Sequence, residues 1–401
     1  MQTRVPSAEL EHCFGANVSH PLALYIHIPF CTTCCSYCAF YSEEEASWLP
    51  YRQRYMERLE TELQETVSSL DGPFSTIFIG GGNPGCLTYA QLESMLTLAQ
   101  SKGTAAECTI EMNPETFGRS LFPLFADRLV TRVSMGIQSM DDGVLTTLGR
   151  NARRSDNLRA IALAKEAKEA YGTELSFDLM LCLPGQTLAM AIADIDEVMV
   201  LASPSHISLY CLTVEEGTDL SQKVSSGLLP VLDEDGQEAF LWGVWDHLKG
   251  LGFRHYEVSN FSRGDHLCNH NLTYWNLDPY IGLGCTAVSA LRDGTSLRHV
   301  SQIQRLFAYS QGVPFSGYSA EILTPTEHLE EFLMMALRTD RGIDKALFAS
   351  RFSLSFDKFF SQVIESLDFS WFVSTEQIFV LTEIGFMVLD EIVLRFALAV
   401  L

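Results

Sequence analysis

The 401-residue chain lacks any run of about 18 uninterrupted apolar residues, the length that a membrane-spanning helix needs. Residues 1–20 also lack the continuous apolar stretch of a secretory signal peptide. The C-terminal segment 392–401 is too short to span a bilayer and carries Arg395, so we expect an ordinary buried helix there. These absences predict a cytoplasmic location, with no transmembrane segment and room only for peripheral membrane contact.

Positive charge is scarce, because 27 Lys and Arg residues stand against 50 Asp and Glu residues, a formal net charge of −23. A surface of this kind repels polyphosphates, so nucleic acid is not an expected partner. The chain has no internal repeat and no low-complexity tract. Hydrophobic residues make up 47% of the sequence, which is enough for a sizeable core.

Eleven cysteines, an odd number in a chain without an export signal, do not predict a disulfide framework. Three of them, Cys31, Cys35 and Cys38, form a CxxxCxxC motif directly behind an apolar run at residues 22–30. Three closely spaced thiolates can hold three irons of a [4Fe–4S] cluster and leave the fourth iron open to a ligand. The motif therefore predicts such a cluster, with Cys34 as a bystander.

A structural zinc site is the alternative interpretation of these cysteines. Such a site takes four protein ligands, commonly two CxxC pairs that lie well apart. Cys31 and Cys34 form one CxxC pair and His27 lies nearby, but the chain contains no distant second pair. A zinc-stabilised structural protein thus stays open as a second hypothesis.

Apolar strand-like runs alternate with amphipathic helix-like segments through the first two-thirds of the chain. This alternation predicts βαβ units and a parallel sheet, and six strands indicate an incomplete (β/α)6 TIM-like barrel. The expected strands are 22–28, 76–82, 108–114, 132–138, 175–181 and 206–214, and the expected helices are 48–69, 89–101, 142–147, 155–170, 189–201 and 236–251. We expect a lead-in at 1–20, a barrel at 21–250, and a C-terminal domain at 251–401 that is loop-rich over 253–291 and then mostly helical.

Polar residues and glycines follow the ends of successive expected strands. Because the carboxyl ends of parallel strands meet at one edge of a barrel, these residues predict one shared site. Glycines in such a place let the backbone run close to a ligand. The residues are Gly81, Gly82, Asn83, Glu111, Gln138, Arg150 and Asp178.

The cysteine motif, the glycine run and the segments 183–187, 206–218 and 255–261 together resemble the coproporphyrinogen III oxidase-like (HemN/HemW) branch of the radical S-adenosyl-L-methionine (SAM) superfamily, over residues 24–396. The resemblance implies that SAM binds the open iron. It also implies an electron donor, such as a flavodoxin or ferredoxin, and release of a 5′-deoxyadenosyl radical. The implied SAM-binding residues are Tyr25, Tyr37, Gly81, Gly82, Asn83, Glu111, Gln138, Arg150 and Asp178.

Within this branch the chain is more similar to the HemW-like haem chaperones than to the dehydrogenases. Phe40 stands where the dehydrogenases carry a fourth cysteine, and residues 270–275 match the HNxxYW signature of the chaperones. The signature implies haem binding through His270, an imidazole being a good axial ligand for iron, and delivery to haem-accepting proteins. Cys268 is an alternative soft ligand.

An oxygen-independent coproporphyrinogen III dehydrogenase is the other hypothesis, and whether the chain is an enzyme is left open. Several residues depart from the family pattern, and the loss of two histidines favours haem binding over porphyrin oxidation. The departures are Asn83 for Thr, Ala39 for an acid, Cys182 for Gly, Ala152 for His and Val288 for His.

Overall fold

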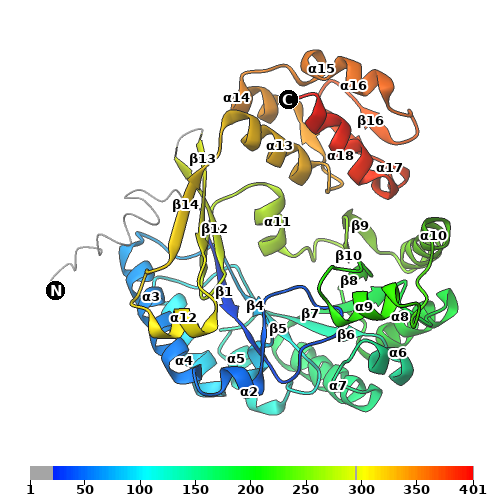
Figure 1. The fold of residues 1–401 in the computed structure, drawn as a ribbon. Helices are drawn as coiled ribbons and strands as arrows, with labels where there is room; N and C mark the ends of the chain where they lie inside the picture. The colour runs from blue at the N-terminus through cyan, green and yellow to red at the C-terminus, as the bar shows by residue number, and fades with distance from the viewer. Residues whose placement is uncertain (1–20, 294–295, 401) are drawn as a thin grey trace.

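The computed structural model describes residues 21–293 and 296–400 (Figure 1). Six parallel strands lie side by side in chain order at the centre of a twelve-stranded sheet. The expected incomplete (β/α)6 barrel is therefore confirmed. The six strands are β1 (Ala23–Ile28), β4 (Thr76–Gly81), β5 (Glu107–Met112), β6 (Arg132–Gln138), β7 (Glu174–Leu181) and β8 (His206–Cys211).

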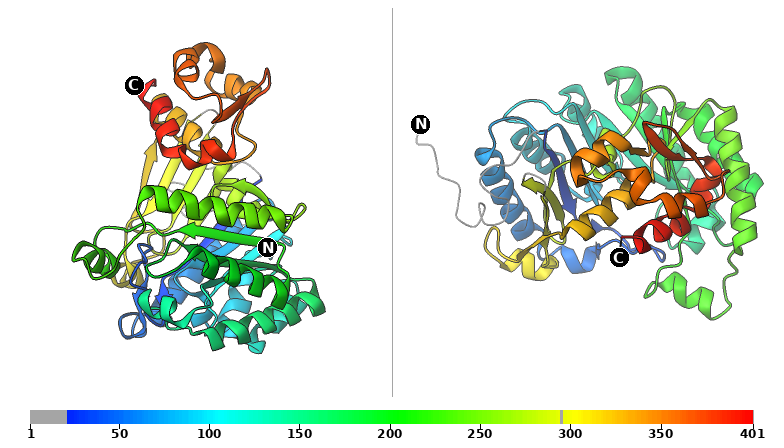
Figure 2. Two further views of the ribbon diagram at one scale, coloured as in Figure 1. Left: turned by 90° about the vertical axis from the view of Figure 1, so that its right-hand side faces the viewer. Right: turned by 90° about the horizontal axis from the view of Figure 1, so that it is seen from above.

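Helices cover the outer face of these strands and bury their apolar sides against the sheet (Figure 2). Residues at the helix ends explain where the helices begin and stop. A capping box at Thr88 begins α4 (Tyr89–Ala99), and Gly172 in the left-handed conformation ends α7 (Arg154–Tyr171). The other elements of this layer are α2 (Glu45–Trp48), α3 (Arg52–Ser69), η1 (Pro84–Cys86), η2 (Arg119–Leu121), α5 (Phe122–Ala126), α6 (Asp142–Thr147), α8 (Leu188–Ala202), α9 (Asp219–Ser225) and α10 (Glu234–Gly250).

The sheet continues past residue 250 at both of its edges. Beyond β8 lie the antiparallel strands β10 (Asn260–Ser262) and β9 (Arg254–Glu257). Beside β1 lies the parallel strand β11 (Tyr280–Leu283). The stretch 253–291, expected to be loop-rich, thus contributes four strands, because short segments pair with barrel strands far away in the sequence. Antiparallel strands complete this edge: β12 (Val288–Asp293), β13 (Ser296–Gln302) and β14 (Tyr318–Ile322).

A mostly helical C-terminal part packs beside the barrel (Figures 1 and 2). Its core is a cluster of phenylalanine rings, including Phe348, Phe356, Phe360 and Phe396, each no more than 2% exposed. It holds α13 (Pro325–Ala336), α14 (Lys345–Phe352), α15 (Phe356–Phe359), α16 (Ser361–Ser366), α17 (Glu383–Met387), α18 (Leu389–Leu398) and a sheet of β15 (Ile343–Asp344), β17 (Ile378–Leu381) and β16 (Phe372–Ser374).

Short elements join these parts. They are β2 (Phe30–Cys31) with β3 (Glu43–Glu44), α11 (Asn269–Trp275) and α12 (Leu306–Gln311). Among the helices in the described ranges, none combines the length and the apolar character needed to cross a bilayer.

Candidate functional site

The cysteine motif lies on the loop that leaves the carboxyl end of β1, between β2 and β3. Burial, with the neighbouring Cys34, Cys35 and Cys86 thiols, raises the pKa of Cys31 to about 12, and burial also raises the pKa of Cys38. Without metal these thiols therefore stay protonated, and a metal has to displace their protons. The Cys34 sulfur lies 3.6 Å from the Ser42 hydroxyl.

The cysteines of the motif lie close enough to affect one another, because, beside burial, the Cys35 thiol contributes to the raised pKa of both Cys31 and Cys38. Across residues 21–293 and 296–400, no three His, Cys, Asp or Glu side chains gather around one position as ligands of a single metal ion. A [4Fe–4S] cluster does not need that arrangement, because its cysteines bind different irons. The side chains of all three cysteines are partly exposed, so a cluster can reach them without opening the core.

Arg150 links the cysteine loop to the end of β6. Its guanidinium donates to the Gly136 carbonyl at 2.6 Å and to the Asn113 side-chain oxygen at 3.3 Å, and it lies 3.7 Å from the Cys35 sulfur. The cysteine loop is thereby held beside the residues at the carboxyl ends of β5 and β6. Gln138 has a positive φ of 64°. Its side-chain amide lies over Gly136, the residue whose carbonyl accepts from Arg150.

Two carboxyl groups lie on β5 and β7, near the end of β5 and in the middle of β7. Glu111 accepts a hydrogen bond from the Gly81 amide at 3.2 Å, and Asp178 accepts one from the Ser134 hydroxyl at 3.0 Å. Burial and the nearby Asp178 raise the pKa of Glu111 to about 7, and burial also raises the pKa of Asp178. Such groups accept hydrogen bonds from an amine or a hydroxyl once a ligand brings them.

The glycine run after β4 is needed for packing within the chain itself. A Cβ atom on Gly81 would lie 2.4 Å from the His27 ring, and one on Gly82 would lie 2.8 Å from the Phe30 carbonyl. Asn83, expected in the SAM site, caps η1, because its side-chain oxygen accepts from the Gly85 amide at 3.0 Å. The run thus holds β4 tightly against the root of the cysteine loop.

The two tyrosines expected to contact SAM have different neighbours. The Tyr25 hydroxyl lies 3.0 Å from His27 Nδ1, and both residues are on β1. Tyr37 packs against a small apolar cluster that includes Leu148 and Leu220. Asn113 and Ser134, which hold Arg150 and Asp178, were missed from the sequence because a polar residue in or just after a strand carries no signal of its own.

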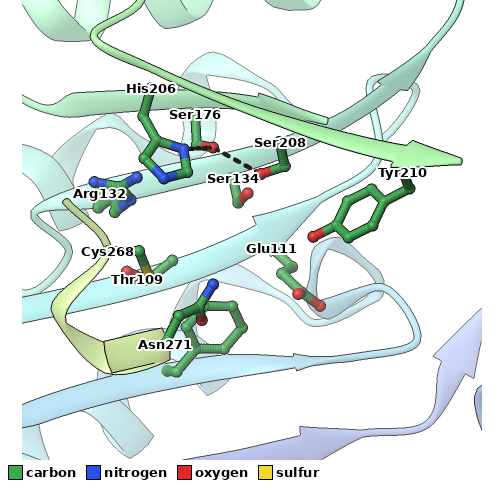
Figure 3. A pocket seen from close by; sticks show the side chains of 11 residues that line it. Thr109, Glu111, Arg132, Ser134, Ser176, His206, Ser208, Tyr210, Cys268 and Asn271 are labelled. Carbon is green, nitrogen blue, oxygen red and sulfur yellow. Dashed lines mark hydrogen bonds between the residues drawn. The ribbon is translucent and has the colours of Figure 1, made fainter. Parts of the chain in front are cut away.

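A polar cavity of about 90 Å³ lies inside the barrel (Figure 3). The Glu111 side chain faces it near the carboxyl ends of the strands, and Arg132 and His206 line it near their amino ends. Small-molecule sites usually measure about 300–1,000 Å³, so this cavity has room for water or one small group rather than a whole nucleoside.

His270 is fully buried on α11, and both of its ring nitrogens are hydrogen-bonded. Nδ1 lies 2.8 Å from the Thr76 hydroxyl, Nε2 lies 2.8 Å from the Tyr274 hydroxyl, and the ring stacks on Phe78 at 5.1 Å. Burial lowers the pKa of His270 to about 3. In this conformation neither nitrogen is free to ligate iron.

The His270 ring and the cysteine loop lie at opposite ends of β4. His270 contacts Thr76, the first residue of β4, whereas the cysteine loop packs against Gly82, just beyond the last residue of the same strand. At about 3.3 Å per residue the two ends of β4 lie about 16 Å apart. The histidine is therefore distant from the cysteines, although Tyr274 of the same helix lines a cavity together with residues 39–41 of the cysteine loop.

The residues at the carboxyl edge fit a polar ligand such as SAM. Three buried polar atoms there, Gln138 Oε1, Arg150 Nε and Glu115 Oε2, have no hydrogen-bond partner within the described chain. Buried polar groups are normally paired, so unpaired donors and acceptors beside the cysteine loop are groups that a ligand would satisfy.

The chain matches two family models, the radical SAM superfamily over residues 25–198 and the HemN C-terminal domain over residues 323–388. It is similar to the Heme chaperone HemW of Synechocystis sp., with 35% identity over 80% of this chain and 79% of that protein. The HemW of Haemophilus influenzae is 30% identical over 93% of this chain and 97% of that protein.

A mitochondrial relative from Mus musculus, the radical S-adenosyl methionine domain-containing protein 1, is 34% identical over 80% of this chain and 74% of that protein. Among solved structures, the coproporphyrinogen III oxidase HemN of Escherichia coli has the same fold, with a TM-score of 0.79 and 21% identity over 94% of this chain and 90% of that one. The chain belongs to the HemW family of the radical SAM superfamily.

Proposed function

We propose that this chain binds haem, a [4Fe–4S] cluster and SAM, and that it passes haem to acceptor proteins. The observation that carries the proposal is the similarity to HemW chaperones over nearly the whole chain, with all three cysteines of the motif present. The acceptor proteins, an electron donor of the flavodoxin or ferredoxin type and a cytoplasmic location are parts of the same proposal.

Cys31, Cys35 and Cys38 would hold the cluster, and the Arg150 guanidinium lies 3.7 Å from the Cys35 sulfur. When bound together, the reduced cluster and SAM supply a 5′-deoxyadenosyl radical. The remaining residues would bind and orient SAM through backbone groups, carboxyl groups, side-chain amides and two tyrosine side chains. These are Tyr25, Tyr37, Gly81, Gly82, Asn83, Glu111, Gln138 and Asp178.

Glu111 and Asp178 suit an amino group and ribose hydroxyls, because each is half-buried and its oxygens keep lone pairs that can accept further hydrogen bonds. The pKa of Glu111, raised to about 7, falls when a cation approaches, so binding of a sulfonium or ammonium group beside it would release a proton. Both residues would bind and orient SAM.

The test is purification without oxygen, followed by iron, sulfide and zinc analysis and titration with hemin, each with and without SAM. We expect about four irons and four sulfides per chain, as a [4Fe–4S] cluster requires, and saturable hemin binding. One zinc per chain without sulfide would instead favour the zinc-stabilised structural protein. Steady decarboxylation of coproporphyrinogen III by the reduced protein would favour the dehydrogenase.

A further inference from the structure

A second cavity, of about 430 Å³, lies between the cysteine loop and the turn from β11 to β12. Its size falls within the range of about 300–1,000 Å³ that small-molecule sites occupy. Two large apolar side chains at this cavity are left uncovered, Phe40 at 78% and Val288 at 39% exposed. Exposed apolar side chains grouped around a hollow mark a binding surface.

The walls of this cavity are aromatic. Tyr25, Tyr41, Tyr274 and Tyr280 line it, and the rings of Tyr274 and Tyr280 meet edge to face at 4.7 Å. Aromatic rings with such fixed orientations offer flat apolar surface and hydroxyl groups to a planar ligand. The lining contains no Asp or Glu, although the chain as a whole is strongly acidic.

Charged groups lie beside one wall of the cavity. The exposed Arg305 guanidinium lies 5.5 Å from the centre of the Tyr41 ring, which itself lines the cavity. The Tyr41 hydroxyl donates to the Glu43 carboxylate at 2.8 Å, so Arg305 is not the only charge beside this ring. A planar ligand that carries carboxylates would meet aromatic walls, with Arg305 as a cation beside them.

The Tyr274 side chain connects this cavity to the buried histidine of the HNxxYW motif. His270 Nε2 lies 2.8 Å from the Tyr274 hydroxyl, and the two rings meet at 87°. Nδ1 of the same ring is held by Thr76, so the imidazole is fixed from both sides. The histidine thus sets the direction of a tyrosine that faces the cavity.

We propose that this cavity seats the porphyrin macrocycle of haem, and that His270 positions Tyr274 rather than ligating iron; the inference rests on the proposed haem binding. Ala39 and Val288, two positions where the sequence departs from the family pattern, line the cavity together with Phe40, which replaces the fourth cysteine of the dehydrogenases. Ala39 and Phe40 directly follow Cys38, so a seated macrocycle contacts the loop that carries the cluster ligands.

The test is hemin titration, followed by absorbance, of the full chain and of variants at exposed positions, where folding is not at risk. Val288→Asp places a carboxylate in the cavity and Phe40→Ala removes its uncovered ring, so we expect at least a tenfold rise in the hemin Kd for each. Phe369→Ala, which removes an 82% exposed ring from the C-terminal part, is the matched control and should change Kd less than twofold.

The role of His270 is tested with His270→Ala and Tyr274→Phe. Positioning predicts that both variants bind hemin more weakly while the Soret band of bound hemin keeps its wild-type position. A shifted Soret band in His270→Ala but not in Tyr274→Phe would identify His270 as an iron ligand and overturn the positioning role. Thermal melting of each variant shows whether it is folded at the titration temperature.

Three outcomes separate this inference from the function on which it rests. If the wild-type chain binds hemin and Val288→Asp and Phe40→Ala bind it with the same affinity, the assignment of haem to this cavity is overturned, while the proposed haem binding is not. Complete competition between SAM and hemin assigns the cavity to SAM and also overturns the seat. Failure of the wild-type chain to bind hemin at all overturns the proposed function together with the seat.

Discussion

At the scale of single residues, Arg150 distinguishes one cysteine of the motif. Its buried guanidinium lies 3.7 Å from the Cys35 sulfur, whereas the Cys34 sulfur lies 3.6 Å from the Ser42 hydroxyl. The sequence spacing alone already selects Cys31, Cys35 and Cys38, and the position of Arg150 now gives a physical reason for the central member of the motif.

We therefore expect Cys35→Ser to abolish cluster assembly and Cys34→Ser to leave iron content nearly unchanged. Iron and sulfide analysis after anaerobic reconstitution measures both. A Cys34→Ser protein that loses its iron would show that the ligand set is wrong, even if Cys35→Ser loses its iron too.

The candidate site could be predicted in part from the sequence, because Glu111, Gln138 and Asp178 follow a regular alternation of strands and helices. The burial of His270 could not, since its partner Thr76 lies 194 positions earlier in the chain. The same holds for Asn83, whose hydrogen bonds to the next turn are visible only once the chain is folded. Local pattern predicts which strand end a residue occupies, but not which of its atoms remain free.

At the scale of elements, the turn after β4 requires glycine at position 82 because there is no room for a side chain. Gly82 has no side-chain room, because its Cβ would meet the carbonyl oxygens of both Phe30 and Ile28 within 3 Å. Those carbonyls belong to the strand end and to β2, from which the cysteine loop departs. A change in this turn therefore acts on the loop.

We expect Gly82→Ala to lower the free energy of unfolding by about 2–3 kcal/mol through overpacking and to reduce the iron content after reconstitution. The control is Gly172→Ala at the end of α7. No atom lies within 4 Å of the Cβ added at Gly172, but its φ is +72°. The left-handed backbone conformation alone should therefore lower the free energy of unfolding, by about 1–2 kcal/mol. Urea unfolding measures both; an iron content unaffected by Gly82→Ala would separate the turn from the loop.

Helix α3 is tied to the later part of the chain by a buried ion pair. Arg58 and Glu62 are 2.8 Å apart, Arg58 also donates to the Tyr309 and Ser316 carbonyls, and Glu62 accepts from the Tyr309 hydroxyl at 2.6 Å. This network fixes α12 and the segment before β14 against α3.

Replacing Glu62 by Gln keeps the shape of the side chain but leaves the buried guanidinium without its counter-charge. We expect Glu62→Gln to lower the free energy of unfolding by about 3 kcal/mol. Glu57→Gln, on the exposed face of the same helix, should change it by less than about 0.5 kcal/mol. Equal effects of the two changes in urea unfolding would show that the network does not stabilise the fold.

The fold itself was predictable to different degrees in its two halves. The six parallel strands have long apolar runs that any reader of the sequence can find, and they form the expected barrel. The strands β9–β14 are harder to detect because β9, β10 and β11 have only three or four residues each. The partners of β10 and β11 are β8 and β1, which lie far away in the sequence. Pairing of this kind leaves no local periodicity.

At the scale of the whole molecule, His255 joins the barrel to the C-terminal part. Its ring stacks on Phe261 at 4.1 Å, lies 4.6 Å from the ring of Trp245 and meets Phe386 of α17 at 5.3 Å. Burial lowers the pKa of His255 to about 4, and the Val258 carbonyl opposes this shift. The unfolded chain then binds a proton near pH 6.5 that the folded chain does not bind until about pH 4.

Stability should therefore fall as the pH drops below 6.5, and the part due to His255 should disappear in His255→Phe. This part is at most about 2 kcal/mol between pH 6.5 and 5, before allowance for the exposed part of the ring. Melting temperatures at pH 7 and pH 5 measure the difference, with His266→Gln, at a half-exposed histidine, as the control. An identical pH dependence in His255→Phe and wild type would contradict the assignment.

The place of β11 beside β1 has a consequence for biosynthesis. The ribosome completes β1 about 250 residues before it reaches β11, a delay of roughly 12–50 s at about 5–20 residues per second. Throughout this interval one edge of the first strand is unpaired, and Tyr41 lacks the Leu306 amide that holds its hydroxyl at 2.8 Å. The side of the cysteine loop at Tyr41 gains its last neighbours only after β11 and Leu306 have been made, so we expect iron insertion to follow their synthesis rather than to accompany the earlier elongation.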